Sequence, residues 1–193
     1  MKKILLVEGN LKEANQEFTE NGIKTHTESL QESISYYTNN LEIDSVNPSS
    51  DKDIFDKVKD LNKYEGLIWG GSSLNIYSDT KEIRRQIEFM KECQKRIKNI
   101  LAICWGMQVA VTAAGGVVNR GKNGAHRGIA HEIVINPDGL NHPIYKDKDK
   151  IFNTPAFNYD EVVTLPKDAI LLSSNKVNNV MALNFETEFS KIW

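Results

Sequence analysis

Short apolar runs alternate with longer amphipathic segments along roughly the first 115 residues of this 193-residue chain. Apolar runs bounded by glycine or by charged residues are typical of strands that are buried on both faces of a sheet. Four such runs predict strands at 4–7, 42–46, 66–69 and 100–104. Amphipathic segments between these runs predict helices at 30–39, 51–61 and 80–98.

The segment 80–98 has the clearest helical pattern. Asp79 and, three residues later, Glu82 match a capping box at its start. Four apolar residues recur at helical spacing and form one stripe: Ile83, Ile87, Met90 and Ile97. Strands and helices that alternate in this way predict a mainly parallel sheet with helices on both faces and right-handed crossovers.

The pattern changes after about residue 115, where apolar runs are separated by Gly, Asn, Pro and Asp. These runs predict strands, joined as antiparallel hairpins, at 117–118, 132–135, 162–165, 170–173 and 180–185. The length fits one domain with one core. We therefore expect a single α/β domain over 1–193, a three-layer sandwich with a mainly parallel central sheet, helices on both faces and C-terminal antiparallel hairpins.

Composition excludes several classes of protein. A net charge of −2 provides no basic surface for holding nucleic acid phosphates. No apolar run approaches the roughly 20 residues that cross a bilayer, and the run at 4–7 is shorter than the core of a signal peptide. We expect a soluble cytoplasmic protein that binds neither nucleic acid nor membrane, with Cys93 and Cys104 reduced.

The segment 99–116 carries the candidate chemistry, because an apolar strand runs directly into Cys104, Trp105 and Gly106 and then into an apolar helical segment. A strand, a sharp turn and a helix with a nucleophile at the turn form a nucleophile elbow. The turn would expose the thiol, the helix N-terminus would favour the thiolate, and the amide of Trp105 would face a developing oxyanion. Gly106 would let the helix pack closely behind the turn. The alternative interpretation is a buried cysteine at the end of a core strand.

The preceding predicted strand ends in a glycine-rich loop with the sequence WGGSS at 69–73. Adjacent parallel strands bring their carboxyl-end loops together, so this loop can turn a second backbone N–H toward Cys104. Each such donor contributes roughly 3 to 4 kcal/mol to acyl transfer. One thiol and two amides predict an acyl-transfer site.

The run Cys104 to Gln108, CWGMQ, resembles the C-x-G-x-Q signature of class I glutamine amidotransferases, and Gly70-Gly71-Ser72 lies where that family has its oxyanion loop. Further segments follow in the family's order: 66–77, 113–118, 142–143 and 160–166. The resemblance covers nearly the whole chain and is closest to stand-alone GMP-synthase-like domains.

The resemblance implies a flavodoxin-like core and a role for each matching residue. Cys104 would attack the γ-carbonyl of glutamine, the amides of Gly71 and Trp105 would hold the oxyanion, and Gln108 would help hold the substrate. A thioester would form and water would release glutamate. The ammonia would pass to a partner synthetase. No cofactor is expected, because the chain has no nucleotide-binding glycine motif, and the spacing of His126 and His131 does not suit a metal site on one helix face.

The family's catalytic histidine and glutamate follow in a late G-x-Q-x-H-P-E strand, and this chain stops at Trp193 before that strand. We therefore expect a truncated form of an active protein, and a 193-residue polypeptide that is nearly inactive, because losing a general base costs about 10²- to 10⁴-fold. Its histidines do not match the missing base, since His26 is expected far from any strand end, His126 and His131 in a glycine-rich hairpin, and His142 in a surface turn.

Two positions depart from the family: Asn158 stands where relatives carry His, and Ala125-His126 where many have Arg-Glu. Cys93 is interpreted as core filler. Glu8, at the end of the first strand, is expected to cap a helix or face water, with the orientation of a catalytic group as the alternative. Two further hypotheses stay open for the whole chain: a hydrolase of γ-glutamyl amides or peptides, and a non-catalytic binding or regulatory module.

Overall fold

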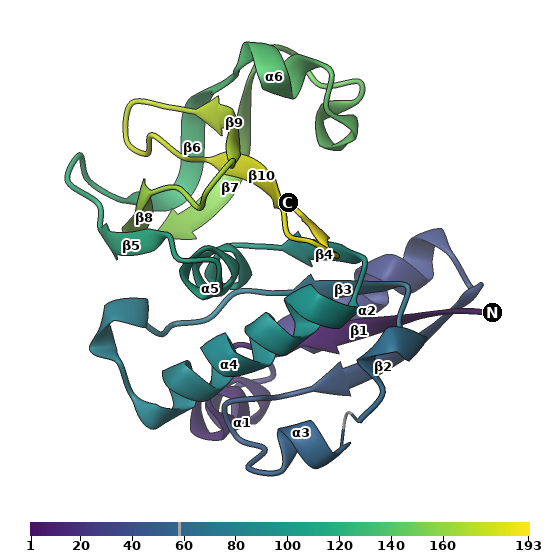
Figure 1. Ribbon diagram of the computed structural model, residues 1–193. Helices are drawn as coiled ribbons and strands as arrows, with labels where there is room; N and C mark the ends of the chain where they lie inside the picture. The colour runs from purple at the N-terminus through teal and green to yellow at the C-terminus, as the bar shows by residue number, and fades with distance from the viewer. Residues whose placement is uncertain (58) are drawn as a thin grey trace.

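The computed structural model describes residues 1–57 and 59–193 and has a mixed sheet at its centre (Figure 1). In the described residues the strands are β1 (Lys2–Val7), β2 (Leu41–Val46), β3 (Gly66–Trp69), β4 (Asn99–Ala102), β5 (Val117–Arg120), β6 (His126–Ile135), β7 (Ile151–Asn158), β8 (Asp160–Thr164), β9 (Ile170–Ser174), β10 (Ala182–Glu186) and β11 (Lys191–Ile192). The helices are α1 (Lys12–Glu20), α2 (His26–Tyr37), α3 (Ile54–Lys57), α4 (Lys81–Arg96), α5 (Trp105–Ala113) and α6 (Pro137–Leu140), with 3₁₀ turns η1 (Leu61–Lys63), η2 (Ile76–Ser78) and η3 (Pro143–Tyr145).

The sheet has the strand order β2-β1-β3-β4-β11-β10-β9-β6-β7. Its β2, β1, β3, β4 and β11 strands pair in parallel, whereas the pairs from β11 to β7 are antiparallel. β5 and β8 form a separate antiparallel pair that contacts α5. Trp69 pairs with Ala102 at the ends of β3 and β4, so the loops that follow these two strands lie side by side.

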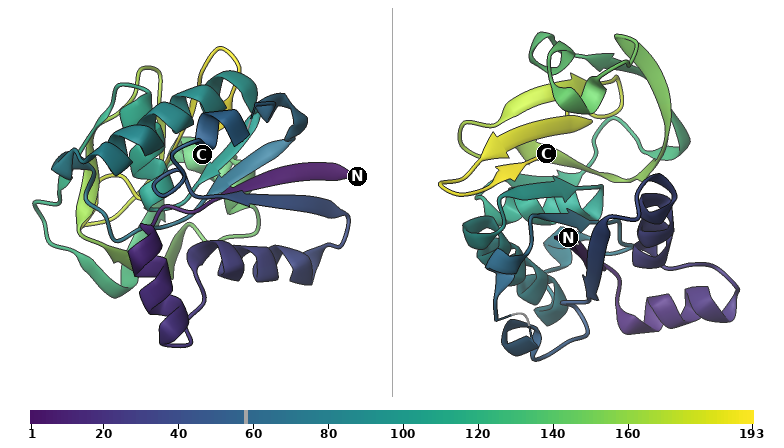
Figure 2. Two further views of the ribbon diagram at one scale, coloured as in Figure 1. Left: turned by 90° about the horizontal axis from the view of Figure 1, so that it is seen from below. Right: turned by 90° about the vertical axis from the view of Figure 1, so that its right-hand side faces the viewer.

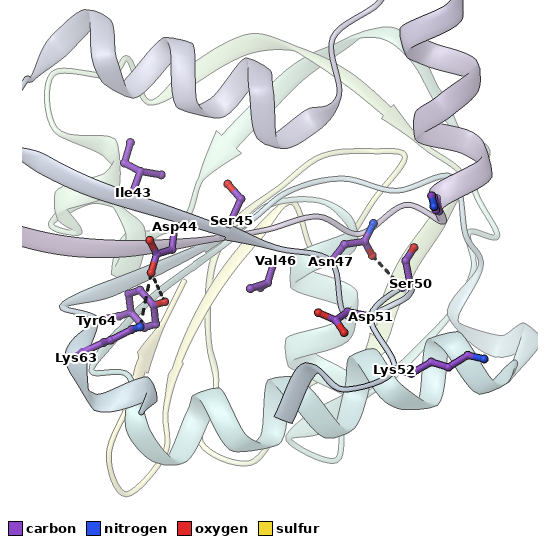
Figure 3. A pocket seen from close by; sticks show the side chains of 11 residues that line it. Ile43, Asp44, Ser45, Val46, Asn47, Ser50, Asp51, Lys52, Lys63 and Tyr64 are labelled. Carbon is purple, nitrogen blue, oxygen red and sulfur yellow. Dashed lines mark hydrogen bonds and ion pairs between the residues drawn. The ribbon is translucent and has the colours of Figure 1, made fainter. Parts of the chain in front are cut away.

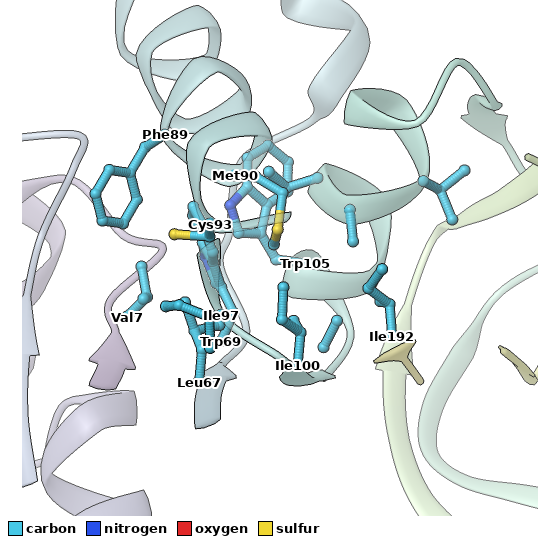
Figure 4. Packing of buried hydrophobic residues seen from close by; sticks show 14 of the residues in the cluster. Val7, Leu67, Trp69, Phe89, Met90, Cys93, Ile97, Ile100, Trp105 and Ile192 are labelled. Carbon is cyan, nitrogen blue, oxygen red and sulfur yellow. The ribbon is translucent and has the colours of Figure 1, made fainter. Parts of the chain in front are cut away.

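Helices cover both faces of the parallel half of the sheet. Figures 1 and 2 show α1 and α2 on one face and α3 and α4 on the other. The apolar face of α4 packs onto β3 and β4, and Figure 4 shows Trp69, Phe89, Met90 and Trp105 in this layer. The indole N–H of Trp105 donates to Gln86 at 2.7 Å, which satisfies a polar group inside the core. The predicted three-layer α/β fold with C-terminal antiparallel strands is confirmed.

Two details of the predicted helices are wrong. Thr80, and not Asp79, is the N-cap of α4, because its hydroxyl accepts the N–H of Ile83. Asp79 has a left-handed backbone with φ 49° and pairs instead with Arg84. The predicted helix at 51–61 is reduced to α3 and η1, with residue 58 outside the described residues. Aspartate side chains accept backbone N–H groups two residues later at both ends of this segment, which competes with helix formation.

The strands β7 and β11 lie outside every predicted element. β7 alternates exposed with half-buried residues and contains Pro155, which weakens a strand prediction from sequence. It nevertheless pairs along its length with β6. β11 has only two residues and forms by pairing with β4 on one side and with β10 on the other. Residues of β7, and Trp193 directly after β11, line the site described below.

Candidate functional site

Cys104 lies on a strained turn between β4 and α5. Its φ of 55° and ψ of −104° lie in a region that residues with a side chain rarely adopt. Gly106 allows this turn, since a Cβ there would lie 2.4 Å from the carbonyl oxygen of Trp69. The predicted arrangement of strand, sharp turn and helix is confirmed, and the alternative of a cysteine buried in the core is wrong for Cys104, which is exposed.

The thiol of Cys104 is accessible but weakly hydrated. Surrounding protein atoms exclude much of the water that would stabilise a thiolate, and this burial raises the pKa of the thiol. The backbone N–H of Trp105 lowers the pKa, and the nearby charge of Asp160 raises it further. The expected effect of the helix N-terminus is therefore present, but desolvation outweighs it and the pKa of the thiol is raised.

The sulfur opens into a cavity of about 360 Å³ between the elbow and the C-terminal strands. Its walls are mostly apolar, and among the described residues the side chains that line it are Leu101, Ala102, Ile103, Met107, Gln108, Ile144, Thr154, Pro155, Ala156, Phe157, Asn158, Asp160, Asn178, Val180, Met181, Ala182, Leu183 and Trp193. Cys104 Sγ lies 4.0 Å from the carbonyl oxygen of Phe157 in β7. A strand that the sequence did not predict thus forms the wall opposite the thiol.

Gln108 follows Cys104 by one helical turn and lines the same cavity. Its side-chain oxygen is buried and has no hydrogen-bond partner among the described residues. This oxygen is therefore a hydrogen-bond acceptor that has no donor. The structure brings this predicted site residue and Cys104 together.

The loop at 70–73, called here the oxyanion loop, continues from β3 beside the elbow. The carbonyl oxygen of Gly70 accepts the N–H of Gly106 at 3.1 Å, which ties the loop directly to α5. In the described part of the chain, the N–H of Gly71 has no acceptor in the protein. Its role as an oxyanion donor stays a prediction.

Asp160 is a candidate site residue that the sequence did not single out. Its carboxylate is buried, lines the cavity and accepts the hydroxyl of Tyr77 at 3.1 Å. Burial raises its pKa, while Tyr77 and the charge of Arg120 act in the opposite direction. The available signal was its place at the start of the 160–166 segment that resembles the family.

One histidine, His26, differs in position from expectation, whereas His126 lies in the antiparallel β6–β7 pair as expected. His126 is 4% exposed, and its ring bonds to Asn158 and to Asn175, both at 2.9 Å. His26 is not far from a strand end, because its Nδ1 lies 2.7 Å from the carbonyl oxygen of Gly71 just beyond β3. No histidine hydrogen-bonds to Cys104 in the portion that the structure describes.

The other two histidines lie in β6 and at the start of η3. His131 is exposed in β6, and His142 caps η3 and stacks edge-on with Trp193. Burial lowers the pKa of His142. Cys93 is fully buried in the core, and desolvation raises the pKa of its thiol, which confirms the interpretation as filler.

A second hollow, of about 740 Å³, lies along β2 (Figure 3) and has no lining residue in common with the Cys104 cavity among the described residues. Asp44 in this hollow accepts the hydroxyl of Tyr64 at 2.6 Å and pairs with Lys3 and Lys63. Its charge is therefore already compensated within the protein. Among the described residues that line the larger hollow there is no cysteine and no histidine, so the cavity at Cys104 is the candidate active site.

No group of three or more His, Cys, Asp or Glu side chains is arranged to hold a metal ion among residues 1–57 and 59–193. None of the helices in these ranges combines the length and the apolar character that a bilayer-spanning helix needs.

Comparison with known families identifies the group to which this architecture belongs. The model of the family described as glutamine amidotransferase class-I matches residues 21–191. The chain belongs to this family. The resemblance carried by Cys104 to Gln108 is thereby confirmed.

Two related proteins carry different enzyme names, a hydrolase and a peptidase. The chain is 30% identical over 136 residues to a γ-glutamyl-L-1-hydroxyisopropylamide hydrolase of Pseudomonas sp, which covers 69% of this chain and 46% of that protein. It is 30% identical over 137 residues to γ-glutamyl peptidase 4 of Arabidopsis thaliana, which covers 70% of this chain and 54% of that protein. The chain thus spans about half the length of these curated relatives.

Two solved structures share the fold of this chain. A glutamine amidotransferase of Thermotoga maritima has a TM-score of 0.66 at 16% identity, covering 99% of this chain and 74% of that one. A protein of Thermoplasma acidophilum that is named as a GMP synthase subunit has a TM-score of 0.62 at 17% identity, covering 100% of this chain and 82% of that one.

Proposed function

We propose that this class I domain cleaves γ-glutamyl amide bonds through a thioester on Cys104, with glutamine as the simplest substrate. The observation that carries the proposal is the nucleophile elbow, in which an exposed thiol stands at φ 55° at the N-terminus of α5 and opens into a cavity. This geometry gives a substrate carbonyl access to the sulfur and to the first amides of the helix.

The reaction has two halves. The thiolate of Cys104 attacks the γ-carbonyl carbon, and the N–H groups of Trp105 and Gly71 hold the resulting oxyanion. The C–N bond then breaks, a proton goes to the leaving nitrogen, and ammonia departs. Water attacks the thioester and releases glutamate and the thiol. Gln108 holds the substrate, a role supported by its place in the cavity lining one helical turn after Cys104.

The 193-residue polypeptide by itself is expected to turn over slowly. The raised pKa of Cys104 keeps most of the thiol protonated near neutral pH, and none of the described histidines bonds to it. Loss of general-base assistance costs about 10²- to 10⁴-fold. As a glutaminase, the domain would deliver its ammonia to a partner synthetase, because ammonia released into water is protonated.

The apolar walls of the cavity favour a second candidate function, the hydrolysis of N-substituted γ-glutamyl amides or peptides. Ile103, Met107 and Phe157 line the cavity beside the thiol and suit an apolar group on the amide nitrogen. The names of the relatives from Pseudomonas and Arabidopsis support the same reaction class. Here the product is an amine and no synthetase is required.

Hydrolysis of glutamine and of γ-glutamylisopropylamide by the same preparation tests both candidates. Glutamate release is measured between pH 7 and 10, with Cys104→Ala as the blank. Faster release from glutamine supports the glutaminase, and faster release from the isopropylamide supports the amide hydrolase. A rate equal to the blank for both substrates, with Cys104 alkylated no faster than Cys93, would establish the non-catalytic module instead.

A further inference from the structure

The carbonyl groups on both sides of Gly71 are held by hydrogen bonds. Nδ1 of His26 donates to the carbonyl oxygen of Gly71 at 2.7 Å, and a carbonyl oxygen only accepts, so this nitrogen carries its hydrogen. The N–H of Gly106 donates to the carbonyl oxygen of Gly70 at 3.1 Å. Because the C=O and N–H of one trans peptide point in opposite directions, the bond from Gly106 fixes the direction of the Gly71 N–H, and the bond from His26 fixes the peptide that follows it, between Gly71 and Ser72.

The imidazole of His26 lies directly against the oxyanion loop. A Cβ on Gly71 would be 3.2 Å from Cε1 of His26, which is closer than an ordinary contact. Asn10 holds the following part of the loop, since its Oδ1 accepts the hydroxyl of Ser72 and the N–H of Ser73, both at 3.0 Å. Hydrogen bonds with His26 in α2 and with Asn10, which follows β1, therefore hold the oxyanion loop.

Glu8 organises both of these side chains. Its buried carboxylate accepts the N–H of Asn10 at 3.0 Å with Oε1, and the N–H and hydroxyl of Thr27 at 3.2 and 3.1 Å with Oε2. Nδ1 of His26 lies 3.9 Å from Oε1. Thr27 is in the first turn of α2, so the expectation that Glu8 caps a neighbouring helix is confirmed.

We propose that Glu8, Asn10 and His26 form a loop clamp, which positions the N–H of Gly71 to receive the oxyanion of the acyl-transfer reaction. The inference rests on the proposed function and names positioning residues for it. Glu8 and His26 act on the loop and not on the substrate. An interaction that matters only when the oxyanion forms affects kcat and leaves KM nearly unchanged.

The test compares two reactions of the same thiol. Hydrolysis of glutamic acid γ-(4-nitrophenyl) ester passes through an oxyanion, and its activated leaving group needs no general acid. Alkylation of Cys104 by iodoacetamide displaces iodide at a saturated carbon and forms no oxyanion. His26→Ala removes the donor, His26→Asn retains a donor near the position of Nδ1, and His131→Ala is the control because His131 is exposed in β6.

We expect His26→Ala to lower kcat for the ester about 10- to 100-fold, less than the roughly 10²- to 10³-fold loss seen when a whole oxyanion donor is deleted. KM and the rate of alkylation should stay within about threefold of the wild type, and His26→Asn should recover most of the lost kcat. His131→Ala should match the wild type.

Three results would overturn the loop clamp: an unchanged kcat in His26→Ala, an equal loss in His131→Ala, or a parallel fall in alkylation that His26→Asn does not restore. In each of these cases the wild type still hydrolyses the ester faster than Cys104→Ala, so the proposed function stands. Equal rates for the wild type and Cys104→Ala would overturn the proposed function together with the loop clamp.

Discussion

The contact between Gly106 and β3 makes a quantitative prediction for Gly106→Ala. The new Cβ would lie 2.4 Å from the carbonyl oxygen of Trp69 and 2.9 Å from its Cβ, whereas ordinary contacts begin at 3.4 Å. The start of α5 and the end of β3 must therefore separate by about 1 Å. The obstacle is mainly backbone, so it cannot rotate away, and the same Trp69 oxygen already accepts the N–H of Ile103 at 2.9 Å.

The expected loss in the free energy of unfolding is about 2 kcal/mol. Overpacking costs roughly 1 to 3 kcal/mol, and alanine returns up to about 1 kcal/mol through its higher helix propensity. The clash with backbone places the overpacking cost near the top of its range. Urea unfolding followed by circular dichroism measures the difference, and ester hydrolysis should fall as well, because the bond from Gly106 to Gly70 orients the oxyanion loop.

Gly66→Ala is the matched control at the other end of β3. Its Cβ would meet the carbonyl oxygen of Asn99 at 3.4 Å, an ordinary contact, so we expect a change within about 1 kcal/mol of zero. If Gly106→Ala were as stable as Gly66→Ala, the close approach of α5 to β3 would not be what requires glycine in the C-x-G motif.

Three further predictions concern charge and buried hydrogen bonds. Alkylation of Cys104 should keep accelerating above pH 9, since burial raises its pKa, while Cys93 stays unlabelled in the folded protein; a plateau below pH 9 in rates mapped by mass spectrometry would contradict this. Asp160→Asn should speed alkylation of Cys104 at pH 8 by less than about tenfold, because it removes a charge that raises the thiol pKa as a secondary cause; unchanged or slower alkylation would exclude that coupling. His126→Ala removes the two hydrogen bonds that this buried ring makes to Asn158 and Asn175 and should cost about 2 to 4 kcal/mol in urea unfolding, against less than about 0.5 kcal/mol for His131→Ala; equal losses would show that these bonds do not matter.

The parallel half of the fold follows from sequence because its strands are buried on both faces. Continuous apolar runs locate β1, β3 and β4 without reference to their neighbours, and each prediction overlaps the observed strand. β7 depends on pairing with β6 and keeps a proline within it, so its own residues give no comparable signal. Since β7 supplies the wall facing the thiol, the shape of the cavity could not be predicted.

The elbow was predictable for a related reason. A strand, a reactive residue and a helix are contiguous at 99–116, so one stretch of sequence carries the whole arrangement. The ionisation of Cys104 could not be predicted from sequence. It depends on how much water the cavity walls exclude and on the charge of Asp160, which lies 56 positions further along the chain. The local effect of the helix N-terminus is present and is outweighed by these distant groups.

The two residues that depart from the family pattern, Asn158 and His126, are hydrogen-bonded to each other. The amide nitrogen of Asn158 donates to the carbonyl oxygen of Asp160, so its oxygen accepts from Nδ1 of His126. Asn175 donates to Nε2, so both ring nitrogens of His126 are engaged in hydrogen bonds. A residue with no free ring nitrogen has no lone pair to take the proton of Cys104. His126 therefore fixes the cavity wall through Asn158 and does not act as the base for Cys104.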